Sequence, residues 1–516
     1  MNKETLKQTE DLEDLKTIAL NLFEENRILQ EQVRFLNDKI FGRRSERKVK
    51  DDGQLSLFDI PEPELSLLEQ PEEEIVIAAH TRKKKGRKAL PADLPRIDVI
   101  HDLDDEEKQC NCGTEKERIG EEVSEQLEYI PPKLRVIRNI RYKYACKNCE
   151  GVEDENPTIA IARMPDQIIP KSIATPGLLA HILTAKFADA LPFYRQEKQF
   201  SRLGIELPRA TMCNWGIKVA DACDILLDIM QDEILKGPLI NIDETTLKVL
   251  KSPRKSKSYV WVFRGGPLDK PIILFQYHPT RSGDAAVNFL KGYEGIVQTD
   301  GYCGYDFLDE ESNIIHAACW VHARRKFKAV TKVAGNKNNP SSNAKAALKY
   351  ISKLYKIEKD ARQENLSATE LHQKRQASAV PILDEFKKWL DHRVEKVPPK
   401  SLLGKAIHYT LNQWTRLNQY TENGIIKPDN NLVENAIRPF VVGRKNWLFS
   451  GSPRGAHASA MIYSLIETAK ANSLEPYWYL RYLFEKLPEA MTTEDFTALT
   501  PQHIDKTVLA NYSARF

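Results

Sequence analysis

The stretch from Pro238 to Val249, PLINIDETTLKV, places two carboxylates inside a segment with the composition of a buried β-strand. Apolar and β-branched residues surround Asp243 and Glu244, and strands bury at least one face. A carboxylate in mid-strand is costly to desolvate unless a metal ion or a basic partner compensates. Side chains alternate along a strand, so only one of the two can face a given site. The stretch therefore predicts a strand that delivers a functional carboxylate.

Two further carboxylates stand on separate predicted elements. Asp300 ends an apolar strand predicted for 295–299, and Gly301 after it lets the backbone turn. Glu434 lies in the run DNNLVENAIRP at 429–439, which predicts a helix capped by Asn430 or Asn431.

Each acid also has an ordinary interpretation, as a turn former for Asp243 and Asp300 or a helix-surface charge for Glu434. Their joint placement favours a shared site instead. Oxygen-only ligands suit Mg²⁺ or Mn²⁺ better than zinc. Two such cations about 4 Å apart serve both ends of an in-line phosphoryl transfer. We therefore expect these three residues to bind metal and to catalyse phosphoryl transfer on DNA.

The elements around these acids predict a ribonuclease-H-like core. Strands are predicted at 258–264, 271–277 and 314–319, and a short helix at 285–290. In that order, Asp243 on the first strand and Asp300 on the fourth become neighbours. Residues 331–420 read as an α-helical insertion before the Glu434 helix. Helices are also predicted at 456–471 and 475–487, followed by a tail of about thirty residues.

The N-terminus carries a heptad pattern, with leucines at 15, 22, 29 and 36 and Asn26 on the same seam. The pattern predicts a coiled coil that self-associates, and a seam asparagine fixes register. The alternative is one amphipathic helix packed on its own domain. The acidic stretch 51–74 is too polar to order itself, and the basic run 82–88 fits either a solvated linker or a phosphate-contacting tether.

Two cysteine pairs, Cys110/Cys112 and Cys146/Cys149, fit a structural zinc site of four thiolates. The first pair is shorter than the usual spacing, so His101 is an alternative ligand there, and incidental cysteines are the ordinary interpretation. A strand predicted at 134–144 carries basic residues that suit either a DNA backbone or plain solvent. Few cysteines for the length favour a reducing cytosol.

Helices predicted at 176–188, 193–203 and 210–220, with Gly204 in a turn, resemble a helix-turn-helix arrangement. Trp447 fits a core position better than a base-stacking one. The net charge is only +3, so DNA affinity must come from local groups. The groups expected to contact DNA phosphates are Arg281, His322, Arg324, Arg325, Arg438, Arg444 and Lys445. No apolar run suggests a signal peptide or a membrane span, which favours a cytoplasmic, nucleoid-associated protein.

Several long motifs together resemble the transposases of the insertion sequence 66 family. They are the runs DET from Asp243, TDGYCGY from Thr299, CWVHARRKF from Cys319, DNNLVENAIRP from Asp429 and GRKNWLFSGS from Gly443. LPFYRQ from Leu191 and SLIETAK from Ser464 match as well, so the likeness spans nearly the whole chain. The CxC pair departs from the CxxC expected of the family, which puts zinc loading in doubt.

The resemblance implies a DDE transposase in which Asp243, Asp300 and Glu434 bind the metal ions. It also implies cut-and-join chemistry at terminal inverted repeats, aided by small accessory proteins of the same element. Two other hypotheses stay open: a DNA-binding, oligomeric remnant without catalysis, and a structure-selective nuclease that does not join strands.

The expected organisation runs through eight segments. In chain order, they are a coiled coil (1–45), a disordered linker with the basic run (46–95), a zinc-finger-like module (96–160), helix-turn-helix-like helices (161–236), the catalytic core (237–330), a helical insertion (331–420), the helix bearing Glu434 (421–452), and a C-terminal helical module with its tail (453–516).

Overall fold

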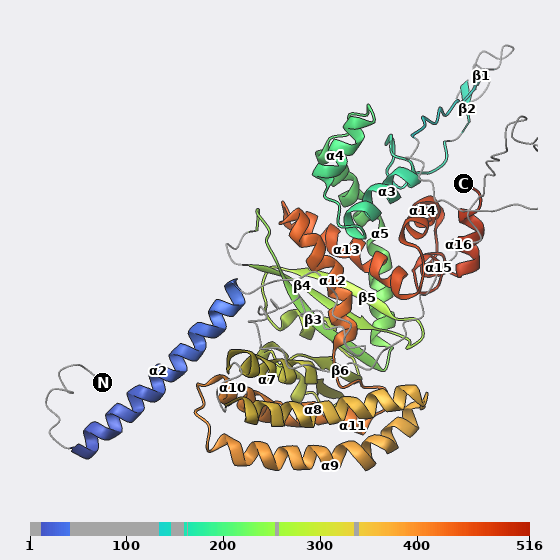
Figure 1. Ribbon diagram of the computed structural model, residues 1–516. Helices are drawn as coiled ribbons and strands as arrows, with labels where there is room; N and C mark the ends of the chain where they lie inside the picture. The colour runs from blue at the N-terminus through green and yellow to red at the C-terminus, as the bar shows by residue number, and fades with distance from the viewer. Residues whose placement is uncertain (1–11, 42–133, 146–158, 163, 253–256, 335–339) are drawn as a thin grey trace, which may run out of the picture. The chain divides into compact units, whose positions relative to one another are not determined.

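The computed structural model describes residues 12–41, 134–145, 159–162, 164–252, 257–334 and 340–516 (Figure 1). The chain divides into one unit of 67–164 and another of the remaining residues, and each is described by itself. The linker, the basic run and the four cysteines predicted to bind zinc lie outside the described residues. None of the helices in the described ranges is both long and apolar enough to cross a membrane.

In the smaller unit, two short strands form an antiparallel pair, β1 (Lys143–Ala145) and β2 (Ile159–Ile161). The prediction of a strand at 134–144 is therefore wrong for most of these residues, because only the last two of them belong to β1. The side chains of 134–142 are exposed, so the alternating apolar residues there have no buried face to stabilise a strand.

The N-terminal heptads form the predicted helix, α2 (Leu12–Phe41). The seam leucines Leu22, Leu29 and Leu36 are 51%, 59% and 52% exposed. Asn26 is also exposed and accepts a hydrogen bond from Gln30 Nε2 at 3.0 Å. This leucine stripe is thus about half exposed, while α2 also contacts α7 (Trp320–Ala334) and accepts a hydrogen bond from the Leu402 amide through Glu31.

The larger unit contains a mixed sheet with strand order β5-β4-β3-β6-β7 (Figure 1). The strands, with their bounds, are β3 (Leu239–Leu247), β4 (Ser258–Gly265), β5 (Ile272–His278), β6 (Gly295–Thr299) and β7 (Ile314–Ala318). β4 lies antiparallel between β3 and β5, whereas β6 runs parallel to both β3 and β7. The predicted strands of this region are confirmed, and β3 is central.

Helices on both sides of the sheet create two hydrophobic cores. The first core joins the sheet to α3 (Pro176–Phe187), α4 (Phe193–Arg202), α5 (Arg209–Leu235) and α13 (Pro453–Ala471). α13 packs on β5, where Thr468 Oγ1 accepts from the Ile273 amide at 2.9 Å and donates to its carbonyl at 3.0 Å. A short α6 (Asp284–Phe289) and the 3₁₀ helix η1 (Cys303–Asp309) flank β6 in the chain.

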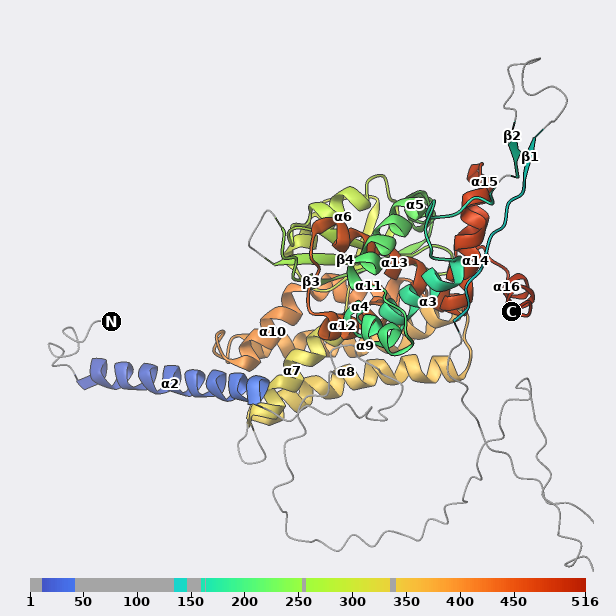
Figure 2. The same cartoon turned by 90° about the horizontal axis from the view of Figure 1, so that it is seen from above.

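The second core lies among helices that follow β7 (Figure 2). These are α7 (Trp320–Ala334), α8 (Pro340–Gln363), α9 (Ala368–Val394), α10 (Leu402–Asn412) and α11 (Trp414–Glu422). They pack on one another and on residues of β3, β6 and β7, including Leu239, Ile296 and Ala318. The chain then returns to the sheet as α12 (Asn431–Trp447), which contacts β3 and β4.

Two expectations for helical segments need correction. The helix expected at 210–220 is α5, which extends for 27 residues because its buried positions recur as far as Ile234. The expected C-terminal tail is ordered: after α14 (Pro476–Lys486) and the 3₁₀ turn η2 (Leu487–Glu489) come α15 (Thr493–Leu499) and α16 (Lys506–Ser513). Leu499, Leu509 and Tyr512 there are at most 6% exposed, and such burial stabilises short helices that local propensity alone would not.

Candidate active site

Asp243 lies in the middle of the central strand. Its side chain is almost entirely buried, with 6% of the residue exposed. Oδ1 accepts a hydrogen bond from the Glu244 amide at 2.8 Å, whereas Oδ2 is buried and has no hydrogen-bond partner among the described residues. A buried carboxylate oxygen without a partner is costly, so a ligand that supplies positive charge would stabilise this atom.

Asp300 follows the last residue of β6, and its Oδ1 accepts from the Tyr302 amide at 2.8 Å. The parallel pairing of β3 with β6 aligns the two strands up to the residues just before the two aspartates. The chain bends at Gly301 as predicted, but without a left-handed backbone conformation. Instead, a Cβ there would lie 2.6 Å from the Tyr409 ring, so the close approach of α10 requires glycine.

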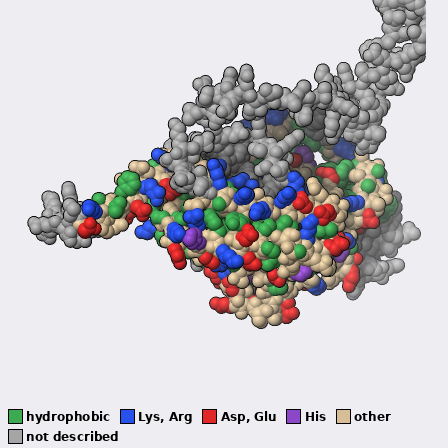
Figure 3. Space-filling model, turned by 60° about the horizontal axis from the view of Figure 1, so that its bottom comes forward, with side chains coloured by type: hydrophobic (Ala, Val, Ile, Leu, Met, Phe, Trp, Pro, Cys, Tyr) green, Lys and Arg blue, Asp and Glu red, His purple; other side chains and the backbone are tan. Residues whose placement is uncertain are grey.

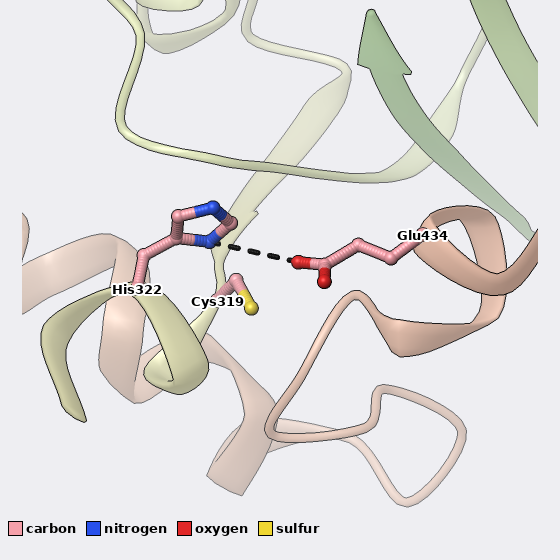
Figure 4. Close-up of side chains that lie close together, drawn as sticks. All are labelled: Cys319, His322 and Glu434. Atoms are coloured by element: carbon pink, nitrogen blue, oxygen red, sulfur yellow. Dashed lines mark ion pairs between the residues drawn. The ribbon is translucent and has the colours of Figure 1, made fainter. Parts of the chain in front are cut away.

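Glu434 comes from the first turn of α12 and is fully buried. His322 Nδ1 lies 3.9 Å from its Oε1 (Figure 4). Arg325 Nη2 lies 3.7 Å from its other oxygen, Oε2. The helix does not end at Pro439 but continues through it to Trp447. Asn430 is the N-cap residue, yet its side chain makes no capping bond; it is used elsewhere, as described below.

The three carboxylates influence one another electrostatically. Burial raises the pKa of Asp243 well above its ordinary value, and the charges of Glu244, Asp300 and Glu434 raise it further. Burial also raises the pKa of Asp300, against the lowering effect of the Tyr302 amide and nearby cationic side chains. Asp243 is therefore near enough to Asp300 and Glu434 to be affected by their charges, although among the described residues the donor atoms of these three acids do not all lie within 4.8 Å of one another.

Glu244 is a further buried carboxylate that the sequence did not assign to the site. Its side chain is only 2% exposed, and it accepts bonds from Arg281 Nε at 2.7 Å and from the Tyr305 hydroxyl at 2.6 Å. Burial raises the pKa of Glu244, and the charge of the nearby Asp300 raises it further. Strand alternation separates Glu244 from Asp243 in direction, but it did not predict that both would be buried. The only signal was the pair of adjacent acids itself.

The basic residues predicted to contact DNA occupy different environments. Arg281 is held by Glu244 and lies 3.7 Å from the centre of the Tyr302 ring. Arg444 donates to Thr245 Oγ1 at 3.0 Å and Thr246 Oγ1 at 3.1 Å of β3. Arg324, Arg325 and Arg438 are half-buried, and Lys445 is exposed. The seven residues predicted to contact DNA therefore do not form one continuous exposed basic surface. Figure 3 shows basic and acidic side chains mixed over one face of the molecule.

His322 does not supply the positive charge expected of it. Burial lowers its pKa to about 3, with Arg325 and Lys326 adding to the effect, so the imidazole is neutral at pH 7. Trp447 packs edge-on against Phe440 with ring centres 5.5 Å apart. This contact confirms the core interpretation of Trp447 over the base-stacking one.

The donor atoms fit a hard divalent cation. Asp243, Asp300 and Glu434 offer oxygen ligands, and Asp243 Oδ2 has no other hydrogen-bond partner among the described residues. Cys319 and His322 also lie near Glu434, with ligand atoms within 4.8 Å of one another (Figure 4). However, burial raises the pKa of the Cys319 thiol, and its sulfur accepts the Asn430 amide at 3.2 Å. A neutral thiol is not the form that binds metal, so the carboxylates are the better ligands.

Comparison with known proteins extends over almost the full chain. Residues 171–458 match the family model described as "Transposase IS66 family", and 464–502 match the "IS66 C-terminal element". Residues 28–99 match "Transposase C of IS166 homeodomain", and 107–150 match the "zinc-finger binding domain of transposase IS66".

Two relatives from Sinorhizobium fredii (strain NBRC 101917 / NGR234) are also similar to this chain over most of their length. The uncharacterized protein y4jD is 32% identical over 94% of this chain and 94% of its own length. The uncharacterized protein y4qI is 32% identical over 89% of this chain and 86% of its own length. From these matches, which lie between residues 28 and 502, the chain belongs to the IS66 family of transposases.

Proposed function

We propose that this transposase cleaves DNA at the terminal inverted repeats of its element and joins the ends to target DNA. The supporting observation is that Asp243 and Glu434 are buried, and that burial, followed by the charges of Glu244, Asp300 and Glu434, raises the Asp243 pKa. Such a group of acids is unfavourable without a cation and suits Mg²⁺ or Mn²⁺. The strand order, with Asp243 central and Asp300 beside it, agrees with a ribonuclease-H-like core.

In this proposal each carboxylate has a defined part. Asp243 and Asp300 hold the cations from neighbouring strands, and Glu434 completes the site from α12. When bound, a pair of such cations stabilises both the attacking and the leaving oxygen of an in-line displacement. Arg281, which bonds to Glu244, and Arg325, which lies beside Glu434, would contact DNA phosphates around the carboxylates.

The test is an assay of strand cleavage and strand transfer by the full chain, with Mg²⁺ and DNA that carries the element's ends. We expect both reactions on end DNA and neither on DNA of scrambled sequence. Binding without cleavage would favour the inactive remnant. Cleavage of branched DNA without joining would favour the structure-selective nuclease.

DNA binding depends in this proposal on exposed basic groups, and Lys445 is the clearest of them. The logarithm of the DNA-binding constant falls linearly with the logarithm of the salt concentration, and removing one lysine that binds a phosphate makes this slope shallower by about one. Lys445→Ala is therefore expected to weaken binding of end DNA and to make that slope shallower by about one, measured by fluorescence anisotropy over a range of salt. Lys387→Ala on α9 serves as the control; equal slopes for both variants and the wild type would remove Lys445 from the interface.

The leucine stripe of α2 supports self-association through a coiled coil, as the proposal requires. Proline within a helix disrupts it by about 3 kcal/mol or more. Leu22→Pro is thus expected to reduce the sedimentation coefficient of the full chain, whereas Glu24→Ala, on the opposite face of the heptad, leaves it unchanged. An unaltered profile for Leu22→Pro would refute the coiled coil.

The remaining partners follow from the same proposal. The zinc-finger segment would carry a structural Zn²⁺ on Cys110, Cys112, Cys146 and Cys149, which lie outside the described residues. Small accessory proteins of the element would assist the reaction. The protein would work in the bacterial cytoplasm, associated with the nucleoid.

A further inference from the structure

Each of the three acids is preceded in the chain, by two or four residues, by an amide side chain. Asn241 precedes Asp243 by two residues on β3, and Gln298 precedes Asp300 by two residues on β6. Residues two apart on a strand share a face. On α12, the N-cap Asn430 precedes Glu434 by one helical turn, and the Glu434 amide donates to the Asn430 carbonyl at 3.2 Å.

These three amides, hereafter the amide cluster of Asn241, Gln298 and Asn430, are bonded to one another in the interior. Asn241 Nδ2 donates to Gln298 Oε1 and to Asn430 Oδ1, at 2.9 Å in both cases. None of the three residues is more than 1% exposed. The cluster thus ties the two strands and the start of α12 together at a single point beneath the carboxylates.

The amide cluster also fixes the backbone that leads into α12. Gln298 Nε2 donates to the Lys427 carbonyl at 2.7 Å, and Asn430 Nδ2 donates to the Ile242 carbonyl at 3.0 Å. Further along the same turn, the Trp320 amide donates to the Pro428 carbonyl at 2.9 Å. Helices α7 to α11 separate β7 from α12 in the chain, so no local connection sets the position of Glu434. These long-range bonds do so instead.

Neutral amides are well suited to this position. The carboxylates repel one another when no cation is bound, which would drive Glu434 away from the two aspartates. A lysine or arginine in place of the amides would hold the acids together but would also neutralise them and compete with a cation. Amides hydrogen-bond the scaffold and leave the charge of the acids available.

We propose that the amide cluster is a positioning device that assembles the metal site before the cation arrives, and that Asn430 is its central member for Glu434. This inference rests on the proposed function, because it concerns the same carboxylates. Residues that orient metal ligands typically change metal affinity by about 10- to 100-fold when they are replaced. Replacing a residue of the cluster should therefore raise the metal concentration needed for half-maximal cleavage, with a smaller effect on the cleavage rate at saturating metal.

The experiment uses the full chain, loaded with zinc beforehand, and Mn²⁺ as the probe. Asn430→Leu and, as a second uncharged variant, Gln298→Met are titrated with Mn²⁺ by electron paramagnetic resonance and in a cleavage assay on end DNA. We expect the half-saturating Mn²⁺ concentration to rise about tenfold or more in both readouts. The cleavage rate at saturating Mn²⁺ should fall much less, and DNA affinity should be unchanged.

Thr468→Val is the matched control, because it also removes buried hydrogen bonds but does so between α13 and β5. It should lower thermal stability and leave the Mn²⁺ dependence as in the wild type. If Asn430→Leu and Gln298→Met cleave with wild-type Mn²⁺ dependence, the positioning role is overturned while the proposed function stands. If the zinc-loaded wild type itself neither binds Mn²⁺ nor cleaves, the proposed function fails, and the positioning role fails with it.

Discussion

Asp243→Asn is expected to abolish strand cleavage and strand transfer while making the metal-free protein more stable. Burial, and then the charges of Glu244, Asp300 and Glu434, raise the pKa of Asp243, so burial and repulsion disfavour its ionised form in the metal-free folded state. Replacing it with a neutral amide of the same shape removes that repulsion. It also removes a metal ligand, and the loss of several kcal/mol of transition-state stabilisation corresponds to a fall in rate of about 10³-fold or more.

The two effects are measured separately on the same variant. Thermal unfolding in the presence of a chelator should show a higher midpoint than the wild type, by about 2–4 °C for each kcal/mol of repulsion removed. Adding Mg²⁺ should raise the midpoint of the wild type and have little effect on the variant, because ligand binding stabilises only the state that binds it. Asp300→Asn and Glu434→Gln should behave in the same way, and all three should retain affinity for end DNA.

Glu467→Gln is the control for this series. Glu467 is a buried carboxylate of α13 whose two oxygens are bonded by Lys470 at 2.9 and 3.0 Å, outside the acid set. Its replacement should leave cleavage near the wild-type rate. Near-normal cleavage by any of the three site variants would remove that residue from the catalytic set, and a lower chelator midpoint for Asp243→Asn would show that repulsion is not the dominant effect at this position.

The parts of the fold that depend on local pattern were predictable from sequence. β3 is predictable because apolar and β-branched residues surround Asp243, and Asp300 because it ends an apolar strand before a glycine. Glu434 was identified within a segment that begins with helix-capping residues. Such signals depend only on neighbours in the chain, so they can be recognised without knowledge of the tertiary structure.

Features that depend on distant residues could not be predicted. Nothing near Glu244 in the sequence indicates that Arg281 and Tyr305 would bond to it. Pro439 normally ends a helix, but α12 continues through it against the packing of Phe440 and Ile437 in the core. The amide cluster was likewise invisible, because a buried asparagine or glutamine has no meaning until its partner is known. The pattern of an amide shortly before each acid can be recognised only when the three elements are seen together.

Arg375→Met is expected to destabilise the larger unit by about 3–5 kcal/mol. Arg375 is 1% exposed and forms a bidentate pair with Glu358, from Nε and Nη2 to the two carboxylate oxygens at 2.8 Å each. Its Nη1 also donates to the Tyr420 carbonyl at 2.6 Å and to the Asn423 carbonyl at 2.8 Å. Removing the guanidinium leaves a buried carboxylate and two carbonyls without these partners. Denaturant unfolding of the full chain, monitored by tryptophan fluorescence, measures the loss.

Two comparisons separate the buried pair from ordinary surface charge. Lys387→Met breaks the exposed pair with Asp391 on α9 and should cost less than about 1 kcal/mol. The double variant Arg375→Met/Glu358→Leu should recover much of the stability lost in Arg375→Met, because the penalty comes mainly from the carboxylate left unpaired. Equal losses for Arg375→Met and Lys387→Met would contradict this account.

The same variant also links the helical layer to the active site. The carbonyls that Arg375 binds, Tyr420 and Asn423, lie at the end of α11 and just after it, and the chain runs from there directly into the turn that holds Asn430. A loosened α11 end should therefore weaken the hold of the amide cluster on Glu434. We expect Arg375→Met to raise the half-saturating Mn²⁺ concentration for cleavage at temperatures where it is still folded, whereas Lys387→Met does not. A normal Mn²⁺ dependence in the folded Arg375→Met protein would limit Arg375 to stability alone.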